Sequence, residues 1–126
     1  MVRDVVCTDV EGIAGGTGPA KMYHVLSKDE LNGHGRLYAR VILPSGSAVG
    51  WHQHIHDTEP YYVLKGEGDF YEADTEDGER KHTKVHAGQV CIIRVGQWHC
   101  MENHSGADLE MMALIYNEPG YDNREL

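Results

Sequence analysis

Hydrophobic and polar residues alternate with a period of two along most of the chain, which is the pattern of half-buried β-strands. Nine segments show this alternation or are short apolar runs bounded by turn residues: 21–26, 36–43, 48–54, 60–64, 67–73, 80–86, 89–95, 98–103 and 109–116. Turn-forming pairs such as Asp77 and Gly78 separate them. Helix is limited to one turn near Ser27 and Glu30, which have the spacing of a capping box.

Short strands joined by tight turns predict an all-β fold, either a β-barrel or a double-sheet jelly roll. The 126 residues are enough for a single domain with a real core. We expect residues 1–20 to form an N-terminal arm with a flexible glycine cluster at 12–18. The barrel is expected over residues 21–118, and residues 119–126 form a C-terminal tail.

The charge and the cysteines exclude several classes of protein. Lys and Arg total 11 against 20 Asp and Glu, for a net charge of -9, so a nucleic-acid partner is not expected. The apolar runs are much shorter than the ~20 residues of a membrane span, so no membrane association is expected. The N-terminus has acidic residues where a secretory leader is apolar, and the three cysteines lack a CxxC spacing. We therefore expect a cytoplasmic protein with free thiols.

The segment from Gly50 to Gly66, GWHQHIHDTEPYYVLKG, carries the candidate chemistry. A helical zinc motif does not fit, because Gln53 stands where that motif needs a glutamate. On a strand, His52 and His54 project to the same face roughly 6.6 to 6.8 Å apart. Their imidazoles can then converge on one metal ion if the strand is curved, and Glu59 on the next strand can add an oxygen ligand.

Two blocks of residues have a defined spacing. The first reads Gly46, five residues, His52, one residue, His54, four residues, Glu59, six residues and Gly66. The second reads Gly88, five residues, Arg94, Val95, Gly96, two residues, His99, three residues and Asn103. Together they resemble the paired motifs of the cupin superfamily at every defined position except Arg94, which replaces a proline.

This resemblance implies a double-stranded β-helix, the jelly-roll barrel of cupins, with a metal near one open end. Carried over by position, the metal ligands are His52, His54, Glu59 and His99. The departure at Arg94 leaves the ligands intact, although the turn before His99 loses the rigidity of a proline.

His56 does not fit the register of the first motif. If His54 and His56 were the ligand pair, residue 48 would have to be glycine, and it is alanine. Only two residues would then separate His56 from Glu59. We expect His56 to lie in the connection between the ligand strands, exposed or at the rim of the pocket.

Three imidazoles and one carboxylate suit a divalent transition metal such as Mn, Fe, Ni or Zn, and disfavour Ca and Mg. Octahedral geometry would leave two positions open. One glutamate leaves a local charge of about +1, which favours a carboxylate or enolate ligand.

Strand parity nominates further pocket residues. Candidates for substrate binding are Tyr61, Met101, Asn103 and Arg40. Tyr61 is also the candidate catalytic proton donor, although a barrel tyrosine reaching toward water explains it equally well. Arg40 would serve as a carboxylate clamp only if its strand face looks inward, and the apolar alternation on the opposite face favours a solvent position for it.

The resemblance is closest to single-domain cupins of the oxalate-decarboxylase type. It implies metal-dependent oxidation or decarboxylation of a small carboxylate. A cupin isomerase or lyase and a non-catalytic, metal-dependent binding or sensor module remain as alternatives. A homodimer is expected, because an N-terminal strand outside the motifs could pair across subunits and cover a sheet edge.

Overall fold

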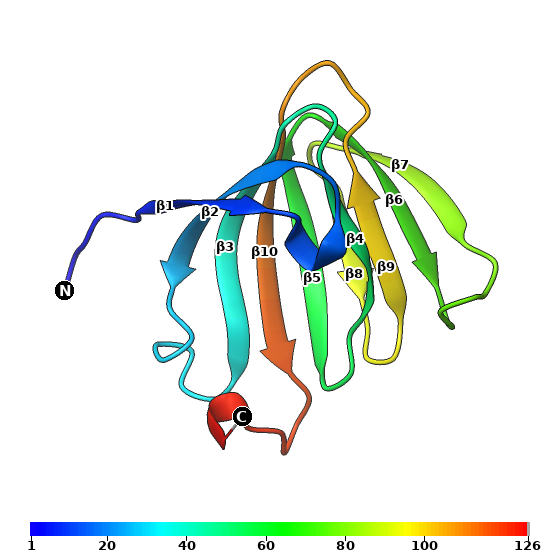
Figure 1. Ribbon diagram of the computed structural model, residues 1–126. Helices are drawn as coiled ribbons and strands as arrows, with labels where there is room; N and C mark the ends of the chain where they lie inside the picture. The colour runs from blue at the N-terminus through cyan, green and yellow to red at the C-terminus, as the bar shows by residue number, and fades with distance from the viewer. Residues whose placement is uncertain (126) are drawn as a thin grey trace.

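The computed structural model describes residues 1–125 and consists of short strands with two 3₁₀ turns (Figure 1). The elements in chain order are β1 (Cys7–Glu11), η1 (Ile13–Gly15), β2 (Pro19–Leu26), β3 (Gly35–Leu43), β4 (Ala48–Gln53), β5 (Asp57–Lys65), β6 (Glu67–Ala73), β7 (Lys81–His86), β8 (Val90–Ile93), β9 (Trp98–Glu102), β10 (Leu109–Asn117) and η2 (Asn123–Glu125). No helix within the described residues is long and apolar enough to cross a membrane.

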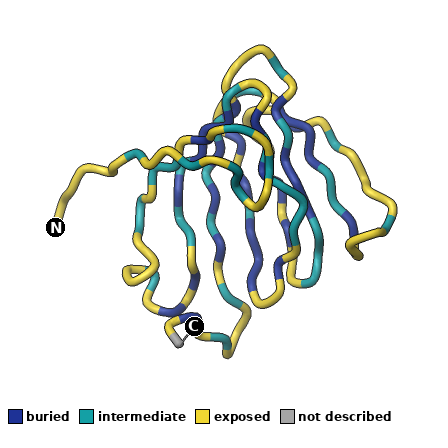
Figure 2. Tube along the Cα trace, in the orientation of Figure 1, coloured by how far each residue is buried: buried dark blue, intermediate teal, exposed yellow. Residues whose placement is uncertain are grey.

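Two antiparallel sheets face each other and enclose the core (Figures 1 and 2). The larger sheet has the order β1-β2-β3-β10-β5-β8, and the smaller has the order β4-β9-β6-β7. The predicted all-β, single-domain fold is therefore confirmed, and the nine predicted strands correspond to β2 through β10. The glycines at the tight turns have positive φ, as at Gly66 (φ 89°), a conformation that glycine adopts without steric cost.

Alternation decides which side chains enter the core. On β3, Ala39, Val41 and Leu43 are buried between the sheets. On β10, Met111 and Ala113 are buried in the same way. This is the face that the alternating pattern predicts as the core side, and its side chains form part of one continuous apolar cluster.

Strand β1 is the one strand that the alternation does not indicate. It lies within residues 1–20, the segment expected to be an arm, and it pairs with β2 in the register Cys7 opposite Tyr23. Its residues are exposed or only partly buried, so no apolar period marks it in the sequence. It forms because β2 offers a free edge for pairing.

The glycine cluster at 12–18 forms the packed turn η1 rather than a flexible connection. A Cβ atom at Gly16 would lie 2.1 Å from the carbonyl oxygen of Ala48, and one at Gly50 would lie 2.1 Å from that of Ala14. The backbones of η1 and β4 thus touch directly, which only glycine permits at these two positions. This contact holds Ile13 over the core, against which it packs.

Candidate metal centre

Four metal-ligating side chains from different parts of the chain meet between the sheets. His52 lies on β4 and pairs with His99 of β9 in the smaller sheet. His54 follows directly after β4, and Glu59 lies on β5 of the larger sheet. The side chains of His54 and His99 are 0% exposed and that of Glu59 is 3% exposed, so these donors are removed from bulk solvent.

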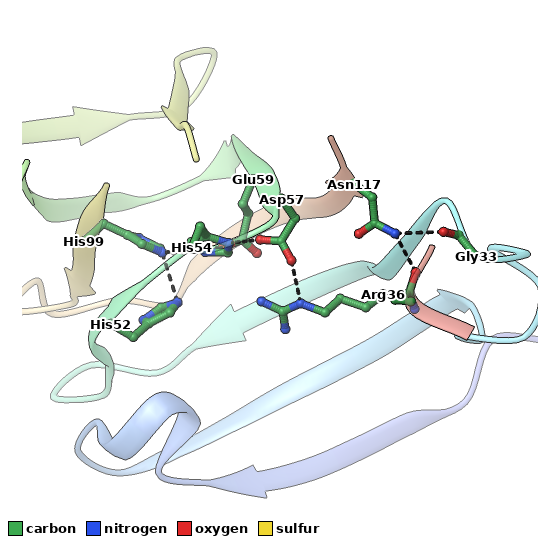
Figure 3. A network of polar contacts seen from close by, with 9 residues as sticks. Gly33, Arg36, His52, His54, Asp57, Glu59, His99 and Asn117 are labelled. Atoms are coloured by element: carbon green, nitrogen blue, oxygen red, sulfur yellow. Dashed lines mark hydrogen bonds and ion pairs between the residues drawn. The ribbon is translucent and has the colours of Figure 1, made fainter. Parts of the chain in front are cut away.

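The donor atoms of this cluster point at one another (Figure 3). The Nε2 atom of His99 lies 3.1 Å from the Nε2 atoms of both His52 and His54. The Oε1 atom of Glu59 lies 3.1 Å from His54 Nε2 and 3.6 Å from His99 Nε2. All four donor atoms lie within 4.8 Å of one another.

Hydrogen bonds set the orientation of two of the rings. His52 Nδ1 donates to the carbonyl oxygen of Gly50 at 2.8 Å, and His54 Nδ1 donates to Asp57 Oδ1 at 2.5 Å. A neutral imidazole that donates through Nδ1 presents the lone pair of Nε2. In their neutral forms both rings therefore present a lone pair toward His99 Nε2, an approach that requires a proton or a cation between the nitrogens.

The donor set fits a transition-metal ion. Two ligands at right angles, each about 2.1 Å from an ion, stand about 3.0 Å apart. That spacing is close to the 3.1 Å between the Nε2 atoms of His99 and its two neighbours. Outer hydrogen bonds like that from His54 to Asp57 are typical of metal-binding histidines, because they fix the ring and raise its basicity.

Burial and neighbouring charges give the three histidines different pKa values. Burial, together with the charges of His52 and His54, lowers the pKa of His99 to about 2. Burial also lowers the pKa of His52. For His54, burial opposes the charged form, but hydrogen bonds to Asp57 and Glu59 outweigh it and raise its pKa to about 9. At neutral pH a metal ion would therefore compete with one proton, held on His54.

An ion pair between the exposed Arg36 and the buried Asp57 supports the metal cluster. Asp57 accepts the bond from His54 through Oδ1 and one from Arg36 Nε through Oδ2, at 2.9 Å (Figure 3). Burial would raise the pKa of Asp57, but the bonds to His54 and Arg36 outweigh it and lower that pKa. Sequence reasoning missed both residues of this pair.

Strand alternation does not indicate Arg36 as a site residue, because β3 is irregular where it begins. Ile115 of β10 pairs with Leu37, and the next residue, Tyr116, pairs with Gly35, so Arg36 has no partner at this register shift. Such a bulge changes the direction of the side chain. An acidic residue three positions after His54 was the one signal in the sequence that could have indicated Asp57.

A cavity of about 360 Å³ opens beside the cluster. Its lining residues are Ile13, Ala14, Met22, Arg36, Leu37, Val41, Val49, His52, Glu59, Tyr61, Met111, Ala113 and Ile115. Tyr61 is buried, and burial followed by the charge of Glu59 raises its pKa well above the ordinary value. The phenol therefore stays neutral, and its hydroxyl group lies beside Glu59 on the cavity lining.

Of the four candidates for substrate binding, Tyr61 alone lines this cavity. Met101 is fully buried in the core, and Asn103 Nδ2 donates to the carbonyl oxygens of Leu43 and Ala107, which shapes a turn. The guanidinium of Arg40 lies 4.2 Å from the ring centroid of Tyr23 and contacts Glu110 at 3.4 Å, away from the cavity lining.

His56 lies outside the group of four donors. Its ring stacks on that of Tyr121, with 4.2 Å between the centroids. The residue sits in the connection between β4 and β5, where the register of the first motif places it.

Comparison with known proteins agrees with this fold and cluster. A family model described as a cupin domain matches residues 39–115. An oxalate-binding protein of Thermotoga maritima is 40% identical over 106 residues, which cover 84% of this chain and 83% of the relative.

Comparison with solved structures also finds proteins of the same fold. The crystal structure of a protein from Thermotoga maritima, described as a predicted oxalate decarboxylase, superposes with a TM-score of 0.82. It is 38% identical, and the match covers 94% of this chain and 99% of that one. The CENP-C cupin domain of Drosophila melanogaster shares the fold alone, with a TM-score of 0.68 and 13% identity over 89% of this chain and 70% of that one.

The two facing sheets and the cluster of three histidines and one glutamate define a β-barrel protein with a candidate metal site between its sheets. The chain belongs to the cupin family. The resemblance drawn from the two spaced blocks is thereby confirmed.

Proposed function

We propose that this protein binds one divalent transition metal through His52, His54, Glu59 and His99, and that it oxidises or decarboxylates a small carboxylate there. The observation that carries this proposal is the convergence of four donor atoms, three of them from buried residues, beside a cavity. The name of the oxalate-binding relative supports a carboxylate as the ligand.

A bound metal would supply Lewis-acid or redox chemistry. The chain itself provides the binding of the ligand around it. Arg36 offers a positive charge to a carboxylate, and Tyr61 offers a neutral hydroxyl donor. The apolar remainder of the lining offers a ligand few hydrogen-bonding groups besides these two residues and the metal donors.

A second candidate function is metal-dependent binding without turnover. Apart from the metal donors His52 and Glu59, Arg36 and Tyr61 are the titratable residues that line the cavity. Arginine stays charged, and burial keeps the Tyr61 phenol neutral, so neither changes its protonation state near neutral pH. The lack of an acid-base pair poised near pH 7 on this lining favours a binding module.

Metal content and gas exchange test the proposal. Purified protein should hold one transition-metal ion per chain, and His99→Ala should abolish this loading while the matched variant His56→Ala retains it. Full loading of His99→Ala would refute the ligand set. O₂ uptake or CO₂ release with oxalate or another small carboxylate supports the enzyme, whereas stabilisation by the same acids without turnover supports the binding module.

A further inference from the structure

We propose that the preferred ligand is a 2-oxo or 2-hydroxy acid that carries an aliphatic chain, rather than oxalate. This inference rests on the proposed function, because it assigns the acid end of the ligand to the metal side of the cavity. It concerns the part of the cavity that the metal donors do not form.

The polar groups of the cavity lie together. His52, Glu59 and Tyr61 line it from the metal side, and Arg36 is the one lysine or arginine on the lining. Arg36 Nε donates to Asp57, which accepts from His54 Nδ1, so the guanidinium is tied to the metal side of the cavity.

The free end of Arg36 points toward this polar group. Its Nε atom is bound to Asp57, and its two terminal nitrogens point toward His52 in Figure 3. The side chain is 46% exposed, so an incoming ligand can reach it. Arg36 can therefore receive one carboxylate that also lies beside the metal.

The rest of the lining is apolar. Its members belong to η1, β2, β3, β4 and β10, and they are Ile13, Ala14, Met22, Leu37, Val41, Val49, Met111, Ala113 and Ile115. None of these side chains can donate or accept a normal hydrogen bond except the weakly accepting sulfur of methionine. A ligand that fills this space must present an apolar group to it.

Oxalate consists of two joined carboxylates and has no such group. A cavity of about 360 Å³ lies in the range of about 300 to 1,000 Å³ that holds larger ligands. Each methylene removed from water contributes about a fourfold gain in affinity. An acid with an aliphatic chain can therefore bind more tightly than oxalate, until the chain fills the apolar part of the cavity.

Isothermal titration of the Mn²⁺-loaded protein tests this preference. The probes are oxalate, pyruvate, 2-oxobutanoate, 2-oxopentanoate and 2-oxohexanoate. We expect affinity to rise by about fourfold per methylene along the series, and the longer acids to bind more tightly than oxalate. Oxalate binding more tightly than every 2-oxo acid, or affinity that stays level with chain length, would overturn the inference.

Two pairs of variants test the acid-binding end and the apolar end of the cavity separately. Arg36→Gln should weaken every acid by about tenfold to a hundredfold, whereas Arg40→Gln, on the same strand but outside the cavity, should not. Ile13→Ala should reduce the gain from the longer chains and leave oxalate unchanged, while Ile92→Ala, at an exposed position, should change neither. An equal effect of Ile13→Ala on oxalate and 2-oxohexanoate would contradict the apolar subsite.

The metal content of each sample keeps the two proposals apart. If the wild-type protein does not retain Mn²⁺ or any other transition metal, the proposed function fails. If it retains the metal and prefers oxalate, the proposed function stands and the chain-bearing ligand is refuted.

Discussion

Replacing Asp57 with asparagine should change how metal affinity depends on pH. The Asp57 carboxylate accepts hydrogen bonds from His54 Nδ1 and Arg36 Nε and helps to raise the pKa of His54 to about 9. The neutral amide introduced by Asp57→Asn would remove that charge and could serve only one of the two donors as an acceptor. The variant therefore loses both a competing proton and an orienting contact.

The size of the effect follows from the His54 pKa. At pH 7 the wild-type protein lies about two pH units below a pKa of about 9, so the need to deprotonate His54 weakens apparent metal affinity about a hundredfold. Affinity should recover by that factor between pH 7 and pH 9. In Asp57→Asn the His54 pKa falls toward its ordinary value, and the gain over the same range should be less than tenfold.

At pH 9 the lost orienting contact should dominate. Outer partners of metal-binding histidines contribute about tenfold to a hundredfold in metal affinity, so the variant should be weaker by that amount there. Near pH 7 the smaller proton competition in the variant offsets most of this loss. Competition with a chromophoric chelator at several pH values measures both curves, and parallel curves would refute the role assigned to Asp57.

Four further predictions concern proton release, the pH dependence of stability, the glycine contact and the assembly. Metal binding at pH 7 should release about one proton, because His54 alone of the three histidines is protonated there. Calorimetric titration in buffers of different ionisation enthalpy measures the number of protons released. Release of two or more protons would contradict this assignment. Without metal, the stabilisation from charged His54 is complete below about pH 6.5 and is lost as pH rises through about 9, so the melting temperature of the apoprotein should fall over this range and that of the metal-loaded protein should not. Gly16→Ala should lower the free energy of unfolding, measured by urea denaturation, by about 1 to 3 kcal/mol, because its Cβ would meet the Ala48 carbonyl. Gly106→Ala, with open space around it, should have little effect. Equal stability of the two variants would be inconsistent with the η1 contact. The protein should be a homodimer by light scattering, because the N-terminal strand β1 lies at an edge of the larger sheet and can pair across subunits, and a monomer would refute this.

The strands and the metal donors were the predictable part of this molecule. Period-two alternation predicts β2 through β10 because one face of each strand is buried, and it misses β1, which buries neither face. The spacing of His52, His54 and Glu59 indicates the cluster because these residues are neighbours in sequence. Only their resemblance to a known family connects them to His99.

The residues around the cluster depend on distant contacts and could not be predicted locally. Arg36 faces the site because of a register shift against β10, which alternation within β3 cannot reveal. The η1 turn is fixed by the contact between Gly16 and Gly50, two positions from different segments. Strand parity correctly predicts that the side chains of Met101 and Asn103 point into the barrel. It does not predict how far along the barrel they lie, and both are packed away from the cavity lining.

The contact between η1 and β4 has a consequence for how such proteins diverge. The four metal donors lie within the matched cupin region, residues 39–115, whereas Ile13, Met22, Arg36 and Leu37 precede it. Substitutions at Ile13, Met22 or Leu37 would therefore alter which acid the proposed site accepts without touching a metal donor or the Arg36–Asp57 pair. Relatives with identical donors but different residues at these three positions should differ in ligand choice, so shared metal chemistry is a poor guide to a shared substrate.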